Sequence, residues 1–73
     1  MTTQPHTISI TLNGEPHRLA AGISVSALIE QLKMRPARIA VELNGEVVPK
    51  ARYTETMVRE GDRLEVINFV GGG

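Results

Sequence analysis

The stretch TISITLNGEPHRLA, residues 7–20, decides how the fold begins. In residues 7–12, isoleucine or leucine alternates with threonine or serine, which is the period-two pattern of a half-buried strand. Asn13-Gly14 follows, and both residues tolerate the positive φ angles that a type I′ turn requires. Residues 15–20 form the returning strand, in which Pro16 has no N–H to donate and is expected at the strand's start or at a sheet edge. The sequence therefore predicts a β-hairpin.

A helical pattern follows this hairpin. The apolar residues Val25, Leu28, Ile29 and Leu32 are spaced i, i+3, i+4 and i+7, which places them on one face of an α-helix. Ser24 can cap the first turn through its hydroxyl. Pro36 cannot continue a helix, so we expect a helix of about three turns that ends near Met34.

Strand patterns return after the helix. Residues 39–43 alternate in the same way as residues 7–12, and a second Asn-Gly turn at residues 44–45 leads into a short strand at 46–48. Residues 50–60 have no clear period and are expected to form a loop with a turn of helix. The final strand follows a turn at Gly61-Asp62, with Leu64 and Val66 on one face and Ile67 and Phe69 on the other.

The predicted order is thus ββαβββ: an α+β fold in which one helix packs on one face of a mixed sheet. We expect one domain over residues 7–70, preceded by a flexible lead-in at 1–6 and followed by a flexible glycine tail at 71–73. Apolar residues make up 41% of the chain, aromatic residues only 3%, and cysteine is absent, so the core must be aliphatic. The residues predicted to point into this core are Ile8, Ile10, Leu12, Val25, Leu28, Ile29, Leu32, Ile39, Val41, Leu43, Leu64 and Val66.

Charge and hydropathy exclude several classes of partner. The 73-residue chain has eight basic and eight acidic residues, and its sequence pI is about 6.7. No strong basic field would attract nucleic acid or an anionic membrane. Residues 1–10 contain no apolar signal-peptide core, and no apolar run approaches the roughly 20 residues that span a bilayer. We therefore expect a cytoplasmic protein.

The side chains do not form a catalytic or metal-binding pattern. His6 and His17 are the two imidazoles, and neither has the spacing of a metal site or of a nucleophile–base pair. A chain without cysteine cannot attack with a thiolate or hold sulfur as a side-chain persulfide. We expect no enzyme activity, no bound cofactor and no metal.

The C-terminal sequence VINFVGGG, residues 66–73, suggests a different chemistry. Gly71, Gly72 and Gly73 have no side chains, and fully extended they reach about 10 Å beyond the domain. They can pass through a narrow channel and deliver the α-carboxylate of Gly73 to another enzyme. Joined to AMP, this carboxylate becomes open to attack by a sulfur donor, which gives a thiocarboxylate, or by a cysteine and then a lysine amine, which gives an isopeptide. The plainer alternative is an inert, frayed terminus.

The element order, the size and the glycine tail directly after the last strand together resemble the ubiquitin-like β-grasp family. Within it, residues 10–15 (ITLNGE), 41–50 (VELNGEVVPK) and 60–73 (EGDRLEVINFVGGG) are most similar to ThiS, the sulfur carriers of thiamine biosynthesis. The similarity covers residues 7–73. The small subunit of molybdopterin synthase is the closest competitor, but its members typically have prolines before the Gly-Gly end, and residues 67–70 here contain none.

The resemblance implies a specific role for the tail. Gly73 would be adenylated by a ThiF-like activating enzyme that uses ATP, converted to a thiocarboxylate with sulfur from a donor protein, and used by a ThiG-like thiazole synthase. Gly72 would be the other half of the family's Gly-Gly motif, and Gly71 an additional glycine seen in some members. The chain departs from the family at residues 1–6, which precede the usual start, and at Ala27, where a capping-box Glu would assist Ser24.

The outward side chains near the tail are the predicted docking residues for these partners. Ile67, Phe69 and Val70 would form an exposed apolar patch that leads to the tail. The alternative is that the 50–60 loop covers Ile67 and Phe69, with Met57 against them.

Three functions remain open at this point. The favoured one is a sulfur carrier for thiamine thiazole synthesis. The second is a sulfur carrier for another pathway (molybdopterin, thionucleoside or cysteine) or a ubiquitin-like protein modifier on the same fold. The third is a β-grasp interaction module whose tail is inert.

Overall fold

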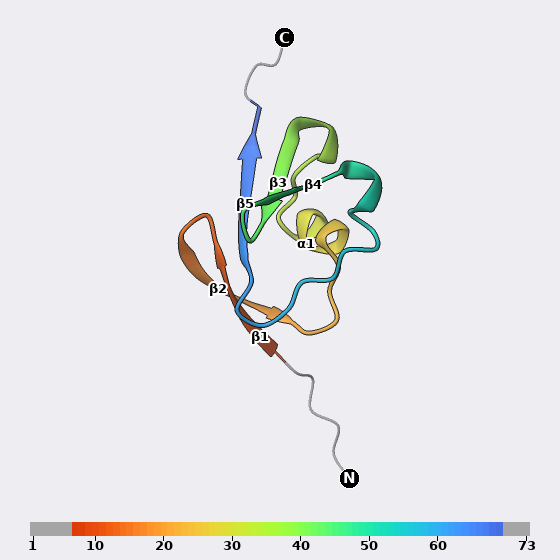
Figure 1. The fold of residues 1–73 in the computed structure, drawn as a ribbon. Helices are drawn as coiled ribbons and strands as arrows, with labels where there is room; N and C mark the ends of the chain where they lie inside the picture. Colours follow the sequence, from red (N-terminus) through yellow and green to blue (C-terminus); the bar gives the residue numbers. More distant parts are fainter. Residues whose placement is uncertain (1–6, 70–73) are drawn as a thin grey trace.

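Two hairpins with the same turn organise the sheet. The computed structural model describes residues 7–69 (Figure 1). Strands β1 (Thr7–Leu12) and β2 (Glu15–Ala20) pair antiparallel, as do β3 (Ile39–Leu43) and β4 (Glu46–Val48). In both two-residue turns the asparagine and the glycine have positive φ, 51° and 83° in the first and 53° and 88° in the second. The two Asn-Gly hairpins are therefore confirmed as type I′ turns.

The last strand joins the two hairpins into one sheet. Strand β5 (Arg63–Asn68) lies between them, parallel to β1 and antiparallel to β3, which gives the order β2-β1-β5-β3-β4. Helix α1 (Val25–Gln31) packs across one face of this sheet (Figure 1), and short 3₁₀ turns η1 (Pro36–Arg38) and η2 (Lys50–Arg52) flank β3 and β4. The predicted ββαβββ mixed sheet is confirmed. Pro16 lies in β2, an outer strand of the sheet, where its missing N–H costs no ladder bond.

The helix is shorter than predicted. It ends at Gln31 rather than near Met34, because Lys33 adopts the left-handed conformation with φ 60°. The Lys33 N–H donates to the Glu30 carbonyl at 3.0 Å and the Met34 N–H donates to the Ile29 carbonyl at 3.2 Å, which is the Schellman pattern of a helix end. The chain thus turns before it reaches Pro36, and the proline is not what stops the helix.

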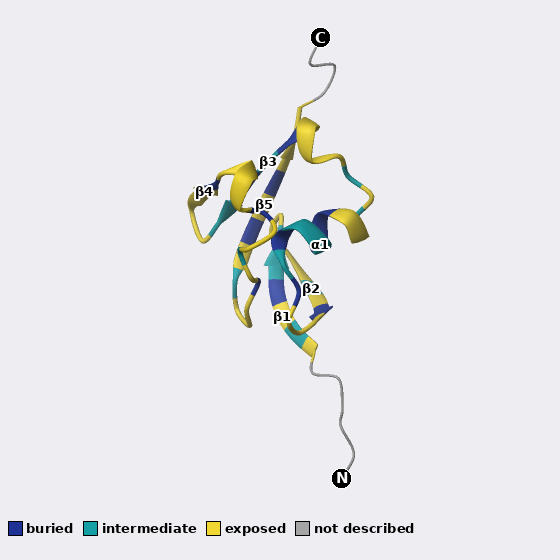
Figure 2. Ribbon diagram, turned by 90° about the vertical axis from the view of Figure 1, so that its right-hand side faces the viewer, coloured by how far each residue is buried: buried dark blue, intermediate teal, exposed yellow. Residues whose placement is uncertain are grey.

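The core lies between α1 and the inner face of the sheet (Figure 2). Eight of the twelve predicted core residues are buried, and the other four, at strand or helix ends, are only half-buried: Ile8, Leu12, Leu32 and Leu43. Five further residues complete the core: Leu19, Ile23, Val48, Tyr53 and Val58. Leu19 and Val48 are the single buried residues of their strands, so no repeat of apolar residues marks them, and Ile23, Tyr53 and Val58 lie outside the helix and the strands.

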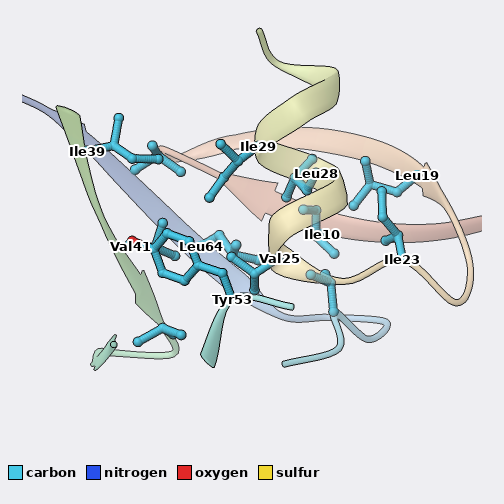
Figure 3. Packing of buried hydrophobic residues seen from close by; sticks show 13 residues of the cluster. Ile10, Leu19, Ile23, Val25, Leu28, Ile29, Ile39, Val41, Tyr53 and Leu64 are labelled. Carbon is cyan, nitrogen blue, oxygen red and sulfur yellow. The ribbon is translucent and has the colours of Figure 1, made fainter. Parts of the chain in front are cut away.

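The irregular segment after η2 closes the N-terminal end of α1. The Val25 N–H donates to the Thr56 carbonyl at 2.8 Å and the Ser26 N–H donates to the Tyr53 carbonyl at 2.9 Å. The Ala27 N–H donates to the Ser24 hydroxyl at 3.1 Å, which confirms the predicted cap. Tertiary carbonyls therefore satisfy two N–H groups that helices leave unpaired at this end, those of Val25 and Ser26. Figure 3 shows Tyr53 of this segment beside Val41 and Val25 in the core.

Candidate functional site

Strand β5, which leads to the tail, is held by the turns of both hairpins. On one side, the Val66 N–H donates to the side-chain oxygen of Asn13 at 2.8 Å, and the Asn13 N–H donates to the Leu64 carbonyl at 2.9 Å. On the other side, the Arg63 N–H donates to the side-chain oxygen of Asn44 at 2.9 Å, and the Asn44 N–H donates to the Arg63 carbonyl at 2.7 Å. Each turn therefore also fixes the position of β5.

This register decides which side chains of β5 face outward. Val66 lies opposite Val41 on the core face, and Ile67 lies opposite Ala40 on the face away from α1. Beyond the strand, the Phe69 N–H donates to the Arg38 carbonyl at 2.7 Å, so the β3 side of the ladder continues to the last described residue. A register shift of one residue would move Ile67 and Phe69 to the core face.

Ile67 and Phe69 are exposed, with 46% and 48% of their surfaces accessible. The 50–60 segment does not cover them: it runs along α1 on the other side of the sheet, where Met57 forms a bridge with Ser24. The alternative of burial under this loop is therefore wrong. The docking role predicted for Ile67 and Phe69 stays a prediction, and that predicted for Val70 concerns a residue outside the described part of the chain.

The sequence interpretation missed a third apolar side chain on this outer face. Val47 in β4 lies opposite Glu42 of β3 and is 68% exposed. Its neighbour Val48 is buried, so alternation within EVV was the signal that one of the two valines points outward. We call Val47, Ile67 and Phe69 the outer-face apolar residues.

The end of β5 lies far from the start of β1, at the opposite end of the molecule (Figure 1). The pairing of β1 with β5 reaches only Leu12 and Leu64, so the last residues of β5 extend past β1. Gly71, Gly72 and Gly73, like the lead-in at 1–6, are outside the described residues. The described chain therefore ends at Phe69, beyond the last strand, and its last outward apolar side chains are Ile67 and Phe69.

Residues 7–69 contain no group of three or more His, Cys, Asp or Glu side chains arranged for a metal ion. His17 lies half-buried in β2. Burial raises the pKa of the Tyr53 phenol, and a hydrogen bond with the Val41 backbone acts in the opposite direction. None of the helices in this described range has the length and apolar character of a membrane span.

Comparison with known proteins agrees with this architecture. The model of the ThiS family matches residues 10–73, which is most of the chain. The chain belongs to the ThiS family. The family predicted from the element order and the Gly-Gly tail is therefore confirmed, as is its ubiquitin-like β-grasp fold.

Individual ThiS relatives match over nearly the same region. The sulfur carrier protein ThiS of Escherichia coli is 32% identical over 66 residues, which are 90% of this chain and 100% of that protein. The crystal structure of the thiamine biosynthesis protein ThiS from Geobacter metallireducens superposes with a TM-score of 0.79 at 36% identity, over 90% of this chain and 100% of that one.

A second kind of relative is much longer. A thiazole synthase of Paramagnetospirillum magneticum is 39% identical over 66 residues, and the chain spans only 20% of that protein's length. A ThiS-like segment thus forms part of a protein named thiazole synthase. A ThiS-like unit therefore occurs both as a separate chain, in the Escherichia coli sulfur carrier, and as a segment of a longer protein.

Proposed function

We propose that this protein carries sulfur for thiamine thiazole synthesis as a thiocarboxylate on Gly73. The observation that carries the proposal is the ThiS match, which extends through the glycine tail to residue 73. Strand β5 supports it, because the two hairpin turns fix the strand and its end leads directly toward that tail. The folded domain binds the partner enzymes, and the tail is the substrate.

The chemistry belongs to these partners. An adenylating, ThiF-like enzyme joins the Gly73 carboxylate to AMP and releases pyrophosphate from ATP. Sulfide (HS⁻) supplied by a donor protein then attacks the glycyl carbonyl. As the C–S bond forms, the C–O bond to AMP breaks, so AMP leaves in place of an oxide ion that could not leave by itself, and the product is the thiocarboxylate. The absence of Cβ atoms at residues 71–73 lets the tail enter a narrow site in extended form, with a reach of about 10 Å.

The recipient that we propose is a ThiG-like thiazole synthase. Its support is the longer relative named thiazole synthase, in which a segment similar to this chain occurs. A recipient in another pathway would receive the same thiocarboxylate, so identification of the recipient needs its own measurement.

Mass spectrometry of the intact protein tests the carrier function. Incubated with ATP, an adenylating enzyme and a sulfur donor, the protein should gain about 16 Da as one oxygen is replaced by sulfur. Purified thiazole synthase with its other substrates should return the mass to its starting value. Conjugates on lysine side chains would instead indicate a protein modifier, and an unchanged mass would indicate an inert tail.

The control is a variant with one alanine added after Gly73. The reactive carboxylate is then displaced by one residue and next to a Cβ atom, so loading should be lost while the fold is retained. If the extended protein, still carrying its alanine, loads sulfur and transfers it, the proposal is wrong.

A further inference from the structure

The chain contains the same four residues, Leu-Asn-Gly-Glu, at two places, 12–15 and 43–46. Both form a type I′ turn, and in both the asparagine side chain accepts a hydrogen bond from a backbone N–H of β5. An asparagine followed by glycine is especially prone to deamidation, because glycine has no Cβ to keep its nitrogen away from the asparagine side chain. Each turn is therefore a candidate site of covalent modification, and the two turns have the same local sequence.

Deamidation is a reaction of the turn with itself and then with water. The backbone nitrogen of the glycine attacks Cγ of the asparagine. The N–Cγ bond forms, the Cγ–Nδ2 bond breaks, and ammonia leaves with the proton of the glycine N–H. Water then opens the cyclic imide at one of its two carbonyls, which gives aspartate or isoaspartate, and no electrons are exchanged. The nucleophile is available in both turns, because within residues 7–69 neither the Gly14 N–H nor the Gly45 N–H makes a backbone hydrogen bond.

The tertiary structure distinguishes the two asparagines at the amide nitrogen. Nδ2 of Asn44 donates to Oδ1 of Asp62 at 3.0 Å, whereas Nδ2 of Asn13 has no hydrogen-bond acceptor in the described part of the chain. The bonds at the side-chain oxygens are similar: the Val66 N–H donates to Asn13 at 2.8 Å and the Arg63 N–H donates to Asn44 at 2.9 Å. The carboxamide of Asn44 is thus held at both its oxygen and its nitrogen, and that of Asn13 at its oxygen.

The contact with Asp62 opposes deamidation of Asn44 in two ways. To meet the Gly45 nitrogen, the carboxamide must leave its hydrogen bonds, and at Asn44 one of these is a bond to a charged group. Attack on Cγ also converts the side-chain oxygen into an oxyanion, and the neighbouring Asp62 carboxylate repels that charge. Asn13 has the same local sequence without this contact, so its reaction should be the faster one.

We propose that Asn13 is a site of spontaneous deamidation in the folded protein and that Asp62 protects Asn44 from the same reaction. The inference goes beyond the proposed function, since the modification needs water alone and no partner enzyme. Its two products differ in their effect on the fold. Aspartate keeps an oxygen that can accept from the Val66 N–H, whereas isoaspartate carries the backbone through the former side chain and adds a methylene to a two-residue turn. Isoaspartate at residue 13 should therefore release β5 beyond the end of its pairing with β1.

The test compares the two turns within one molecule. The purified protein is incubated at mildly alkaline pH, once folded and once in denaturant, and each deamidation raises its mass by the difference between water and ammonia. Trypsin cleaves after Arg18, Arg38 and Lys50, so the two asparagines lie on separate peptides, 1–18 and 39–50. Mass spectrometry of these peptides gives the rate at each asparagine, and enzymatic methylation of the free isoaspartyl carboxylate identifies that product.

The expected rates differ in the folded protein alone. In denaturant they should be nearly equal, because the tetrapeptides are the same. In the folded protein Asn13 should react about three to ten times faster than Asn44. Asp62→Ala should raise the rate at Asn44 toward that at Asn13 and leave the rate at Asn13 unchanged. Glu60→Ala is the matched control: its carboxylate accepts the Ser9 N–H at 3.0 Å from the same loop, so its loss should change neither rate.

The effect on the fold is measured on the separated products. The isoaspartate form should melt at least about 4 °C below the unmodified protein, and the aspartate form should stay close to it. Equal melting temperatures of the isoaspartate form and the unmodified protein would show that the turn at Asn13 does not hold β5, and would overturn that part of the inference.

Three rate results would overturn the assignment of the site. The first is a folded protein in which neither asparagine reacts while the denatured chain does. The second is a rate at Asn44 equal to or above that at Asn13. The third is Asp62→Ala that leaves the rate at Asn44 unchanged or raises both rates equally, which would show that the hydrogen bond to Asp62 gives no specific protection. Because no partner enzyme is present, none of these results bears on sulfur loading.

Discussion

The side chain of Asn13 accepts a hydrogen bond from the backbone N–H of Val66 at 2.8 Å, across 53 positions of sequence. The same residue forms the first turn with φ 51°. Asn13 therefore has two separate roles. Its backbone forms the β1–β2 turn, and its side chain accepts a hydrogen bond from β5 beyond Leu12 and Leu64, where the backbone pairing of β1 with β5 has ended.

Replacement of Asn13 by glycine separates these two roles. Glycine keeps the positive φ of the turn but leaves the half-buried Val66 N–H without its acceptor. We expect a loss of about 1–2 kcal/mol in unfolding free energy, which is a fall of roughly 4–16 °C in melting temperature. Chemical denaturation followed by circular dichroism measures the change.

Asn13→Asp is the matched control for this prediction. Aspartate retains an oxygen acceptor at the same place and also tolerates the left-handed conformation. It should lose much less stability than Asn13→Gly. Equal losses in the two variants would show that the hydrogen bond to Val66 contributes little.

Lys33 gives a prediction in the stabilising direction. It occupies the left-handed position of a Schellman motif, φ 60°, where a side chain with Cβ is disfavoured and glycine is usual. Lys33→Gly should therefore raise the unfolding free energy by about 0.5–1 kcal/mol. Lys33→Ala, which keeps the Cβ, should bring no such gain. A melting temperature of Lys33→Gly at or below that of Lys33→Ala would show that no strain is relieved there.

Tyr53 predicts a loss of stability at high pH. Burial raises the pKa of its phenol in the folded protein above the ordinary value of 10.0. As the pH rises past 10, the phenol of the unfolded chain loses its proton before that of the folded protein does. The free energy of unfolding is therefore constant below pH 10 and falls above it, until the folded phenol also ionises. Tyr53→Phe removes the ionisable phenol, so the variant should not show this loss of unfolding free energy as the pH rises above 10.

The titration of this phenol can be observed directly, because Tyr53 is the one tyrosine of the chain. Its ultraviolet absorbance change in the folded protein should have a midpoint above pH 10. A midpoint at or below 10 would contradict the burial of the hydroxyl in the core.

The sequence predicted the parts of the fold that local chemistry determines. The Asn-Gly turns and the alternation in residues 7–12 and 39–43 depend on neighbouring residues alone, and they were predicted correctly. The left-handed Lys33 was missed, since no glycine or asparagine marks the helix end. Tyr53 and Val58 were missed because their burial depends on the contact between an irregular segment and α1, which no period in the sequence reveals.

The candidate site also has one part that local sequence patterns predict and another part that they do not. The outward direction of Ile67 and Phe69 follows from alternation along β5 and was predicted from sequence. The position of Ile67 opposite Ala40 depends on the β3–β5 register, which joins residues far apart in the chain. Sequence patterns contain no information on that pairing until the strand order is known.

Phe69 tests whether the outer face near the tail binds the partner enzymes. Its side chain is half exposed and contributes little to the core, so Phe69→Asp should leave the melting temperature within a few degrees of the wild type. Loss of its apolar contact and addition of a charge should weaken binding to the adenylating enzyme by about tenfold or more.

Met57→Asp is the matched control: Met57 is 40% exposed, but it lies on the α1 side, away from Phe69. Binding of both variants is measured by titration calorimetry, together with the rate of mass gain on sulfur loading. An unfolded Phe69→Asp would show that this side chain is structural, and equal affinities of the two variants would show that the partner does not use this face.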